Sequence, residues 1–114
     1  MKIVEERVYT GPNIYAYKPV ICLKVLLSPW QGIETKEIPN FNDNLVNLLP
    51  GLGQHHCSRG RPGGFLERLQ EGTYLGHVIE HVALELSSLA GEEVFFGTTR
   101  TTSTPYLYNV VYAY

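Results

Sequence analysis

Cysteine and charge are both scarce in this sequence. Only two cysteines occur among 114 residues, Cys22 in an apolar segment and Cys57 in a polar loop. Small secreted domains rely on several disulfides, so this pair predicts a protein of the reducing cytoplasm. Charged residues make up 18% of the chain, and the formal net charge is −2. A surface that follows nucleic acid needs an excess of basic residues, so nucleic acid is not expected as a partner.

Long hydrophobic runs are also missing. The longest, such as Val25-Leu26-Leu27, are far shorter than the roughly 20 residues of a membrane-spanning helix. The first seven residues are charged and lack an apolar core, so they do not form a signal peptide. Export and a membrane partner are therefore not expected. With 44% hydrophobic residues, the length predicts one globular domain over residues 1–114.

Both ends of the chain have the composition of β-strands. Residues 2–9 and 19–27 are rich in Val, Ile, Leu and Tyr, and the turn-forming Gly11-Pro12-Asn13 lies between them. Residues 93–102 and 106–114 alternate, the second segment strictly, and Ser103-Thr104-Pro105 joins them. The last segment stops while its pattern is still running, so we expect the natural domain to continue beyond Tyr114.

Three segments in the middle of the chain have helical patterns. Residues 42–49 predict a short helix, and a second is expected from Pro62 to Gly72. The strongest pattern runs from Thr73, a candidate N-cap, to Ala90, with Gly91 after it. The order of elements predicts an α+β fold, in which the helices cover one face of a mainly antiparallel sheet.

The longest predicted helix has an apolar stripe and a polar side. The stripe comprises Leu75, Val78, Ile79, Val82, Leu86 and Leu89. At about 100° per residue, His77, Glu80 and His81 cluster nearly opposite it. Two histidines four residues apart on a helix share one face and can bind one metal ion. H-x-x-E-H is the inverted zinc-protease signature, in which the histidines bind Zn²⁺ and the glutamate is the general base.

A catalytic zinc site also needs a third protein ligand and an open position for water. Three candidates stay open: Glu85 on the same helical side, Cys57 from the loop, and a glutamate beyond Tyr114. The alternative is that His77 and His81 merely belong to the polar face of a helix.

The loop His55–Gly64 is rich in glycine and arginine. Glycines allow close approach of the backbone, and arginines donate paired hydrogen bonds to carboxylates, so the loop suits a carboxylate-rich substrate. The alternative is an exposed flexible loop. Cys57 beside His55 or His56 would also suit a thiol nucleophile, but no third orienting residue is evident.

Two features of the C-terminal strands have both structural and functional interpretations. Residues 98–102 offer hydroxyls and Arg100 for pairing with an extended, acidic peptide, or they are an ordinary threonine-rich strand. The tyrosines at 106, 108, 112 and 114 are more typical of one face of a sheet than of a ligand platform.

Several ordered motifs together resemble the amino-terminal part of the cyanophycin synthetases. They are Thr10-Gly11-Pro12-Asn13, Cys57-Ser58-Arg59-Gly60, residues 62–68, Glu71-Gly72-Thr73-Tyr74, residues 76–86 and Thr101-Thr102-Ser103-Thr104-Pro105. The resemblance spans nearly the whole chain and is more specific than H-x-x-E-H alone.

The resemblance implies a domain cut from a large cytoplasmic ligase. Two further domains, absent here, would use ATP and Mg²⁺ to add aspartate and arginine to a polymer with a polyaspartate backbone and arginine on its side chains. The full-length enzyme is expected to be a homo-oligomer. The amino-terminal domain is associated with holding the polymer, and in some members it resembles a metal-dependent hydrolase whose products serve as primers.

The motif at residues 77–81 also resembles that of pitrilysin-type metallopeptidases, where such a helix precedes a threonine-rich strand and a tyrosine-rich strand. Gly97 to Tyr114 fits that order. The distant glutamate ligand of those peptidases is missing from this chain.

These observations favour a zinc-dependent cyanophycin hydrolase. His77 and His81 are the expected metal ligands and Glu80 the general base, while Cys57, Ser58, Arg59 and Arg100 are expected to bind substrate. The rival is a non-catalytic module that tethers the polymer while the other domains elongate it. A third alternative is a structural domain that supports oligomer assembly.

Overall fold

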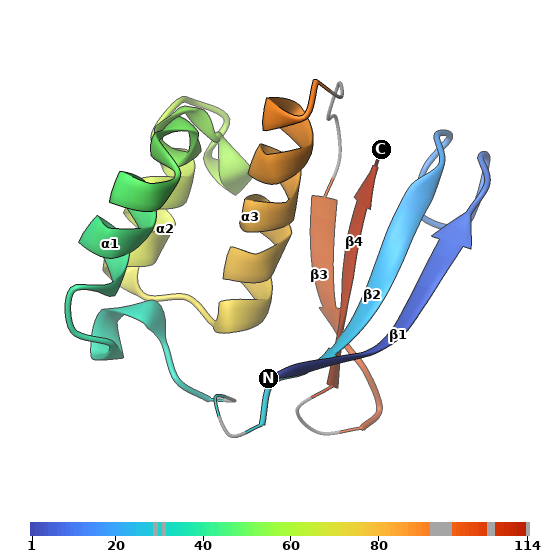
Figure 1. The fold of residues 1–114 in the computed structure, drawn as a ribbon, viewed down its shortest axis with the longest axis horizontal. Helices are drawn as coiled ribbons and strands as arrows, with labels where there is room; N and C mark the ends of the chain where they lie inside the picture. The colour runs from blue at the N-terminus through green and yellow to red at the C-terminus, as the bar shows by residue number, and fades with distance from the viewer. Residues whose placement is uncertain (29, 31, 92–96, 105–106, 114) are drawn as a thin grey trace.

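Four strands form one antiparallel sheet. The computed structural model describes residues 1–28, 30, 32–91, 97–104 and 107–113. The strands are β1 (Lys2–Tyr9), β2 (Val20–Leu26), β3 (Gly97–Thr101) and β4 (Leu107–Ala113), in the order β1-β2-β4-β3 (Figure 1). Both terminal pairs therefore share one sheet, with β1 and β3 at its edges.

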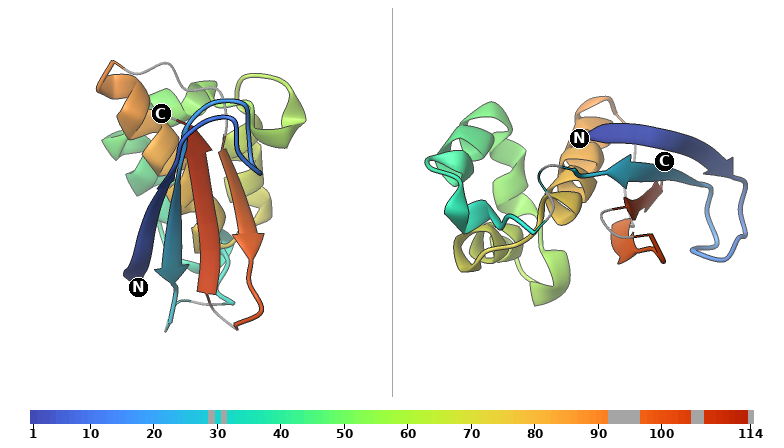
Figure 2. Two further views of the ribbon diagram at one scale, coloured as in Figure 1. Left: turned by 90° about the vertical axis from the view of Figure 1, so that its right-hand side faces the viewer. Right: turned by 90° about the horizontal axis from the view of Figure 1, so that it is seen from below.

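The helices form two layers on one side of the sheet. Helix α3 (Leu75–Leu89) contacts β3 and β4, and α1 (Phe41–Leu48) and α2 (Gly64–Glu71) lie beyond it (Figure 2). Three short 3₁₀ turns, η1 (Thr35–Glu37), η2 (Pro50–Gln54) and η3 (Cys57–Arg59), connect these elements. The predicted α+β fold, with an antiparallel sheet and helices on one face, is confirmed.

A glycine lets α3 approach the sheet closely. A Cβ atom at Gly76 would lie 3.1 Å from Thr99 Cγ2 on β3, and the side chains of Tyr108 and Leu27 are near it. A larger residue would push the first turn of α3 away from the strands. Gly76 therefore helps to set the distance between the helix and the residues of β3 that face it.

Two apolar clusters hold the layers together. On the sheet side of α3, Val25, Leu27 and Val110 are buried and contact Leu75 and Ile79. On the opposite side, the buried cluster joins α3 to α2 and η2 through Leu52, Phe65, Leu69 and Val78. A third cluster covers the far face of the sheet, where Tyr15 packs near Cys22 and Val111. Helix α3 is thus packed from both sides.

Most predicted elements are present, with one wrong cap. The patterns at 2–9, 19–27, 42–49 and 62–72 correspond to β1, β2, α1 and α2. Thr73 is not the N-cap of α3, because Tyr74 occupies that position and the Thr73 hydroxyl contacts the His77 ring instead. The predicted stop is confirmed, since α3 ends at Leu89 and Gly91 has a φ of 95°. Of the strand expected over 93–102, the part at 93–96 lies outside the described residues.

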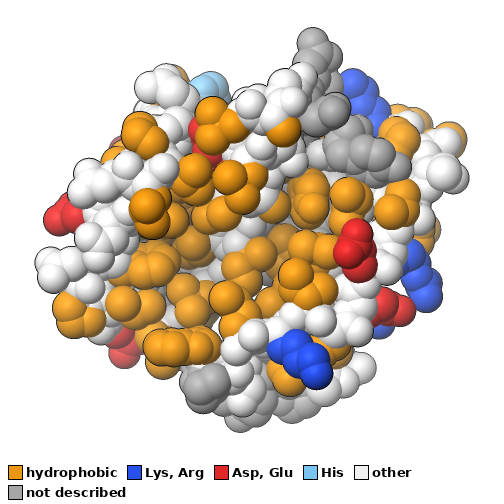
Figure 3. All heavy atoms as spheres, in the orientation of Figure 1, with side chains coloured by type: hydrophobic (Ala, Val, Ile, Leu, Met, Phe, Trp, Pro, Cys, Tyr) orange, Lys and Arg blue, Asp and Glu red, His pale blue; other side chains and the backbone are white. Residues whose placement is uncertain are grey.

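The polar side of α3 is more deeply buried than the end of its apolar stripe. Leu86 and Leu89 are exposed, whereas Glu80, His81 and Glu85 are only 6%, 4% and 7% exposed. Figure 3 shows apolar side chains gathered on the face that is turned to the viewer in Figure 1. Because the end of its stripe is exposed and its polar side is buried, the pattern on α3 does not separate a buried apolar side from a solvated polar side.

None of the helices in the described part of the chain combines the length and apolar character that crossing a membrane requires.

Leu69 is expected to contribute strongly to stability, because it is fully buried between α2 and its neighbours. Leu69→Ala should lower the free energy of unfolding by about 2–5 kcal/mol, as for other buried leucines. Leu48, which is 78% exposed, provides the control, and Leu48→Ala should change it by less than about 0.5 kcal/mol. Urea denaturation of both variants tests this, and equal losses would contradict it.

Candidate functional site

A cleft of about 1170 Å³ opens between α3, β3 and the segment of η2 and η3. The polar side of α3 forms one wall of the cleft through His77, Glu80 and His81, and Cys57 and Thr99 face it from the other elements. The cleft thus gathers residues from three parts of the chain. Each of them approaches α3 because the apolar clusters on both of its sides fix the layers.

His77, His81 and Cys57 form a group with the geometry of a metal site. The two imidazoles lie one turn apart on α3, with ring centroids 4.8 Å from each other. Cys57 Sγ lies 3.3 Å from His77 Nε2. One ligand atom from each of the three residues lies within 4.8 Å of the others. Zinc prefers such nitrogen and sulfur ligands, so the donor set suits this ion.

Burial keeps both imidazoles neutral. The ring of Phe65 stacks on that of His81, with centroids 3.9 Å apart and planes 18° apart. Burial, assisted by the neighbouring His77 and His55, lowers the pKa of His81 to about 3. Burial also lowers the pKa of His77, with a smaller effect from the charge of Arg68. A neutral imidazole has a free nitrogen lone pair, which metal binding requires.

Glu80 is buried beside the histidines and is held by the sheet. Thr99 on β3 donates a hydrogen bond of 2.5 Å to Glu80 Oε2. Burial raises the pKa of Glu80, while this hydrogen bond acts in the opposite direction. Gly97 makes room for the side chain, because a Cβ atom there would lie 3.1 Å from Glu80 Cγ. A carboxyl group with a raised pKa is suited to accepting and returning a proton.

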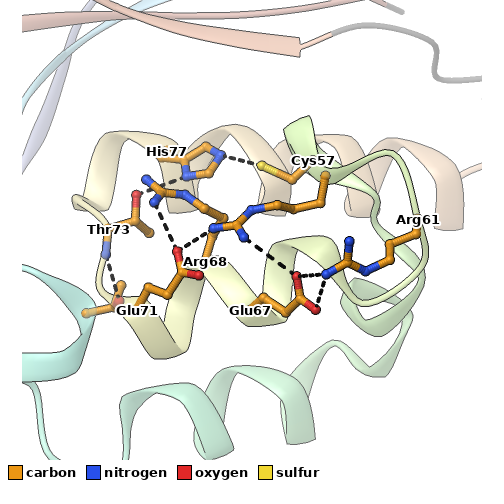
Figure 4. A network of polar contacts seen from close by, with 9 residues as sticks. Cys57, Arg61, Glu67, Arg68, Glu71, Thr73 and His77 are labelled. Atoms are coloured by element: carbon orange, nitrogen blue, oxygen red, sulfur yellow. Dashed lines mark hydrogen bonds and ion pairs between the residues drawn. The ribbon is translucent and has the colours of Figure 1, made fainter.

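Further contacts hold both imidazole rings from behind. Thr73 Oγ1 lies 3.0 Å from His77 Nδ1 (Figure 4). His81 Nδ1 lies 2.8 Å from His55 Nδ1, and His55 Nε2 lies 2.9 Å from Glu85 Oε1. The Nδ1 atom of each ring is therefore engaged, and Nε2 is the nitrogen left for a ligand. Glu85, expected as a possible metal ligand, lies behind His55 and outside the three-residue group.

The loop that carries Cys57 is tightly folded. Cys57 has a φ of 54°, in the left-handed region that non-glycine residues rarely adopt. Gly64 begins α2 directly against the loop, where a Cβ atom would overlap the carbonyl oxygen of His56. Such strain is often found at functional sites, and here it accompanies a thiol close to His77. The backbone of the loop closes into the 3₁₀ turn η3 around Cys57.

The arginines near the cleft are paired with glutamates of α2. Arg59 forms an ion pair with Glu71. Arg61 donates two hydrogen bonds to Glu67, of 2.7 and 2.8 Å (Figure 4). Arg68 lies 3.5 Å from Glu71. Arg59 lines the cleft as well as the shallower hollow formed by these charges. This surface therefore offers groups of both signs next to the histidines.

Arg100 lies on the other face of the sheet. Thr99 faces α3, so the neighbouring Arg100 points the opposite way, and its guanidinium lies over the ring of Tyr15, 5.5 Å from the centroid. The structure therefore does not bring Arg100 together with His77, His81 and Glu80. A role in substrate binding stays a prediction for Arg100 and for Ser58, whose backbone lies in η3.

Comparison with known proteins identifies the chain's relatives. Residues 22–114 match the family described as cyanophycin synthase-like N-terminal domain. The chain belongs to this family. It is 48% identical to the cyanophycin synthetase of Crocosphaera subtropica, 47% to that of Synechocystis and 45% to that of Trichormus variabilis. Each alignment covers all of this chain but only 13% of the relative.

The sequence did not reveal that Thr73 contacts His77, that Thr99 holds Glu80, or that Glu85 contacts His55. From the sequence, His55 was expected only as a base for Cys57. Thr73 precedes His77 by four residues, which is a signal for contact on a helix, although Thr73 lies before α3 begins. The contacts of His55 and Thr99 with α3 bridge 26 and 19 residues of sequence and carry no local pattern.

The lowered pKa of His81 predicts a pH-dependent stability. The unfolded chain titrates near the ordinary value of 6.5, so the stability from neutral His81 is complete above that pH and is lost as the pH falls toward about 3. Within this range, the free energy of unfolding should fall by about 1.4 kcal/mol for each unit by which the pH decreases, because only the unfolded chain gains a proton at His81. Chemical denaturation between about pH 4 and pH 8 measures this slope.

Glu80 acts with the opposite sign, because a raised pKa costs stability as the pH rises, so a variant is needed to isolate the histidine. His81→Gln should flatten the slope between about pH 6.5 and pH 4. His56→Gln, at an exposed neighbouring position, should leave it unchanged. An equal slope in the wild type and His81→Gln would contradict the assignment.

Proposed function

We propose that this domain binds cyanophycin and cleaves it by metal-dependent hydrolysis, and that the shortened chains serve as primers for polymerisation. The observation that carries the proposal is the group of His77, His81 and Cys57, in which His81 is buried and the other two are partly buried, with Glu80 beside it on one wall of an open cleft. The relatives support the proposal through their names, because each is a cyanophycin synthetase.

The donor set fits a zinc ion. His77 and His81 present Nε2 atoms of rings that burial keeps neutral, and Cys57 offers a thiol whose sulfur already faces His77. Three protein ligands leave one position open, which distinguishes catalytic from structural zinc sites. We therefore assign Cys57 as the third ligand, in preference to Glu85 and to a residue beyond Tyr114.

Zinc bound there would polarise the amide carbonyl and lower the pKa of the attacking water. Glu80 takes the proton from that water as the new C–O bond forms, and it returns the proton to the leaving nitrogen as the C–N bond breaks. Hydrolysis thus yields one carboxyl group and one amine. Thr99 holds the Glu80 carboxylate toward the histidines, and Oε1 lies 3.9 Å from His81 Nε2.

The charged surface beside the cleft suits the polymer. Arginine attached to a polyaspartate backbone brings guanidinium groups and carboxylates, so recognition needs partners of both signs. Arg59 offers a forked donor for carboxylates, and Glu67 and Glu71 offer acceptors for guanidinium groups. These pairs are exposed, so exchanging them for substrate groups costs little.

A non-catalytic tether is the second candidate. The same charged surface would hold the polymer without any chemistry, and this function requires neither zinc nor Glu80. The cleft is open to solvent beside Arg59, so a polymer can lie along this surface. This feature favours the tether.

The chain spans 13% of the length of its relatives, so the activity of a whole protein is a further proposal. We propose that this domain works within a cyanophycin synthetase, whose other domains use ATP and Mg²⁺ for ligation. Those domains and further copies of the synthetase would be its partners.

Replacing the proposed general base tests hydrolysis directly. Glu80→Gln removes the ionisable group and should slow the release of new amino ends from cyanophycin by about 10²- to 10⁴-fold, with zinc affinity retained. A chelator should abolish release by the wild type. Glu6→Gln, at an exposed position on β1, is the matched control and should cleave normally. Cleavage that persists in Glu80→Gln excludes the mechanism, and polymer binding without cleavage by the zinc-loaded protein favours the tether.

Cobalt substitution tests the third ligand. Co²⁺ bound at this site should show thiolate-to-metal charge-transfer absorption in the near ultraviolet, because Cys57 Sγ lies beside His77 Nε2. Cys57→Ser should lose this band, whereas Cys22→Ser should retain it, because Cys22 is buried on the far face of the sheet. A wild-type complex without the band would remove Cys57 from the ligand set.

A further inference from the structure

We propose that Glu85 and His55 are positioning residues, which together fix the tautomer of His81 so that its Nε2 lone pair faces the cleft. The inference deepens the proposed function, since it concerns how His81 presents itself to a metal. Its basis is a continuous chain of contacts from Glu85 Oε1 to His55 Nε2, 2.9 Å, and from His55 Nδ1 to His81 Nδ1, 2.8 Å.

The proton positions follow from the order of donors and acceptors. A neutral His55 carries one ring proton. If this proton were on Nδ1, the lone pair of Nε2 would face the Glu85 carboxylate with no hydrogen between them. With the proton on Nε2, His55 donates to Glu85, and its Nδ1 becomes an acceptor. The neighbouring ring must then donate its own proton from Nδ1.

The consequence for His81 is a defined ligand atom. When its proton lies on Nδ1 and is donated to His55, the lone pair of His81 is on Nε2. That atom is on the side of Glu80 Oε1, 3.9 Å away. Metal-binding histidines commonly donate their second ring N–H to a carboxylate or carbonyl, which fixes both the tautomer and the ring orientation. Here a second imidazole stands between the carboxylate and the ligand.

The surroundings hold this chain of contacts in place. Glu85 and His81 are nearly inaccessible to solvent, so water does not readily replace either partner. Gly51 in η2 leaves the space that the carboxylate occupies, because a Cβ atom there would overlap Glu85 Oε2. His55 is the C-cap of η2 and its ring lies 5.1 Å from that of His81. The backbone of η2 thus positions His55 and accommodates Glu85 together.

His77 is held in a different way, which provides an internal comparison. Its Nδ1 contacts the hydroxyl of Thr73, which can either donate or accept. The Thr73 contact therefore orients the ring without dictating the tautomer. An ionised Glu85 can only accept, so the contact through a neutral His55 does dictate the tautomer. We expect His81 to exist as one tautomer in the metal-free protein.

Long-range ¹H–¹⁵N spectra of the histidine rings test the inference without any metal or substrate. Wild-type His81 should show its proton on Nδ1. His55→Leu removes the acceptor, and Glu85→Gln introduces an amide that can donate as well as accept, so both should shift His81 toward the Nε2–H form. His55→Gln retains a side-chain carbonyl and should restore the wild-type form in part. His56→Leu, the exposed neighbour, is the control and should leave His81 unchanged.

Zinc affinity, measured by competition with a chromophoric chelator, provides the second readout. His55→Leu should weaken binding by about 10- to 100-fold, the usual effect of losing such a supporting contact. His55→Gln should weaken it less. The inference is overturned if wild-type His81 carries its proton on Nε2, or if folded His55→Leu and Glu85→Gln match the wild type in both readouts.

The two proposals fail separately. A protein with the expected tautomer that binds zinc but does not cleave cyanophycin would exclude the hydrolase and leave the positioning role intact. Cleavage of cyanophycin by the wild type, together with folded variants that match it in both the His81 tautomer and the zinc affinity, would do the reverse. If His55→Leu does not fold, as circular dichroism would reveal, His55→Gln and the wild-type spectrum still decide the question.

Discussion

The packing of α3 on both of its sides is the constraint on which the rest of the structure depends. Val110 and Leu27 pack against the helix on the side of the sheet, and Phe65 and Leu69 pack against it on the side of α2. Between these apolar layers the polar side of α3 has little access to solvent. The unusual chemistry of His77, Glu80 and His81 follows from this burial, which opposes positive charge on the imidazoles and negative charge on the carboxylate.

Burial of this kind requires a partner for each polar group. Thr99 supplies a hydroxyl to Glu80, Thr73 contacts one imidazole, and His55 with Glu85 contacts the other. The partners come from β3, from the residues before α3, from the C-cap of η2 and from α3 itself. The site is therefore a property of the whole fold, although its central motif occupies five consecutive residues.

The sequence sufficed for the parts of the fold that local patterns determine. The strand patterns predicted the sheet, and the spacing of His77 and His81 predicted that the two rings share a face of one helix. Gly91 marked the end of α3 because a positive φ favours glycine there. A threonine before a helix predicted an N-cap, but at Thr73 the side chain is directed instead to His77, a contact that propensity does not encode.

Long-range placement could not be predicted in the same way. Arg100 and Thr99 are neighbours in the sequence, yet the pleat of β3 puts them on opposite faces of the sheet, and only the pairing with β4 determines which one meets α3. The role of Glu85 depends on His55, which a different segment delivers. The apolar stripe of α3 correctly marked Val78 as core but did not reveal that Leu86 and Leu89 are exposed.

The location of Cys57 has a consequence for folding thermodynamics. Cys57 belongs to the turn before α2, whereas the histidines belong to α3, so an ion held by all three would cross-link two segments that the unfolded chain keeps apart. A ligand that binds only the folded state adds about 1.4 kcal/mol of stability for each tenfold rise in its free concentration above the dissociation constant. The cellular concentration of free zinc would then change the stability of the folded domain, apart from any effect on catalysis.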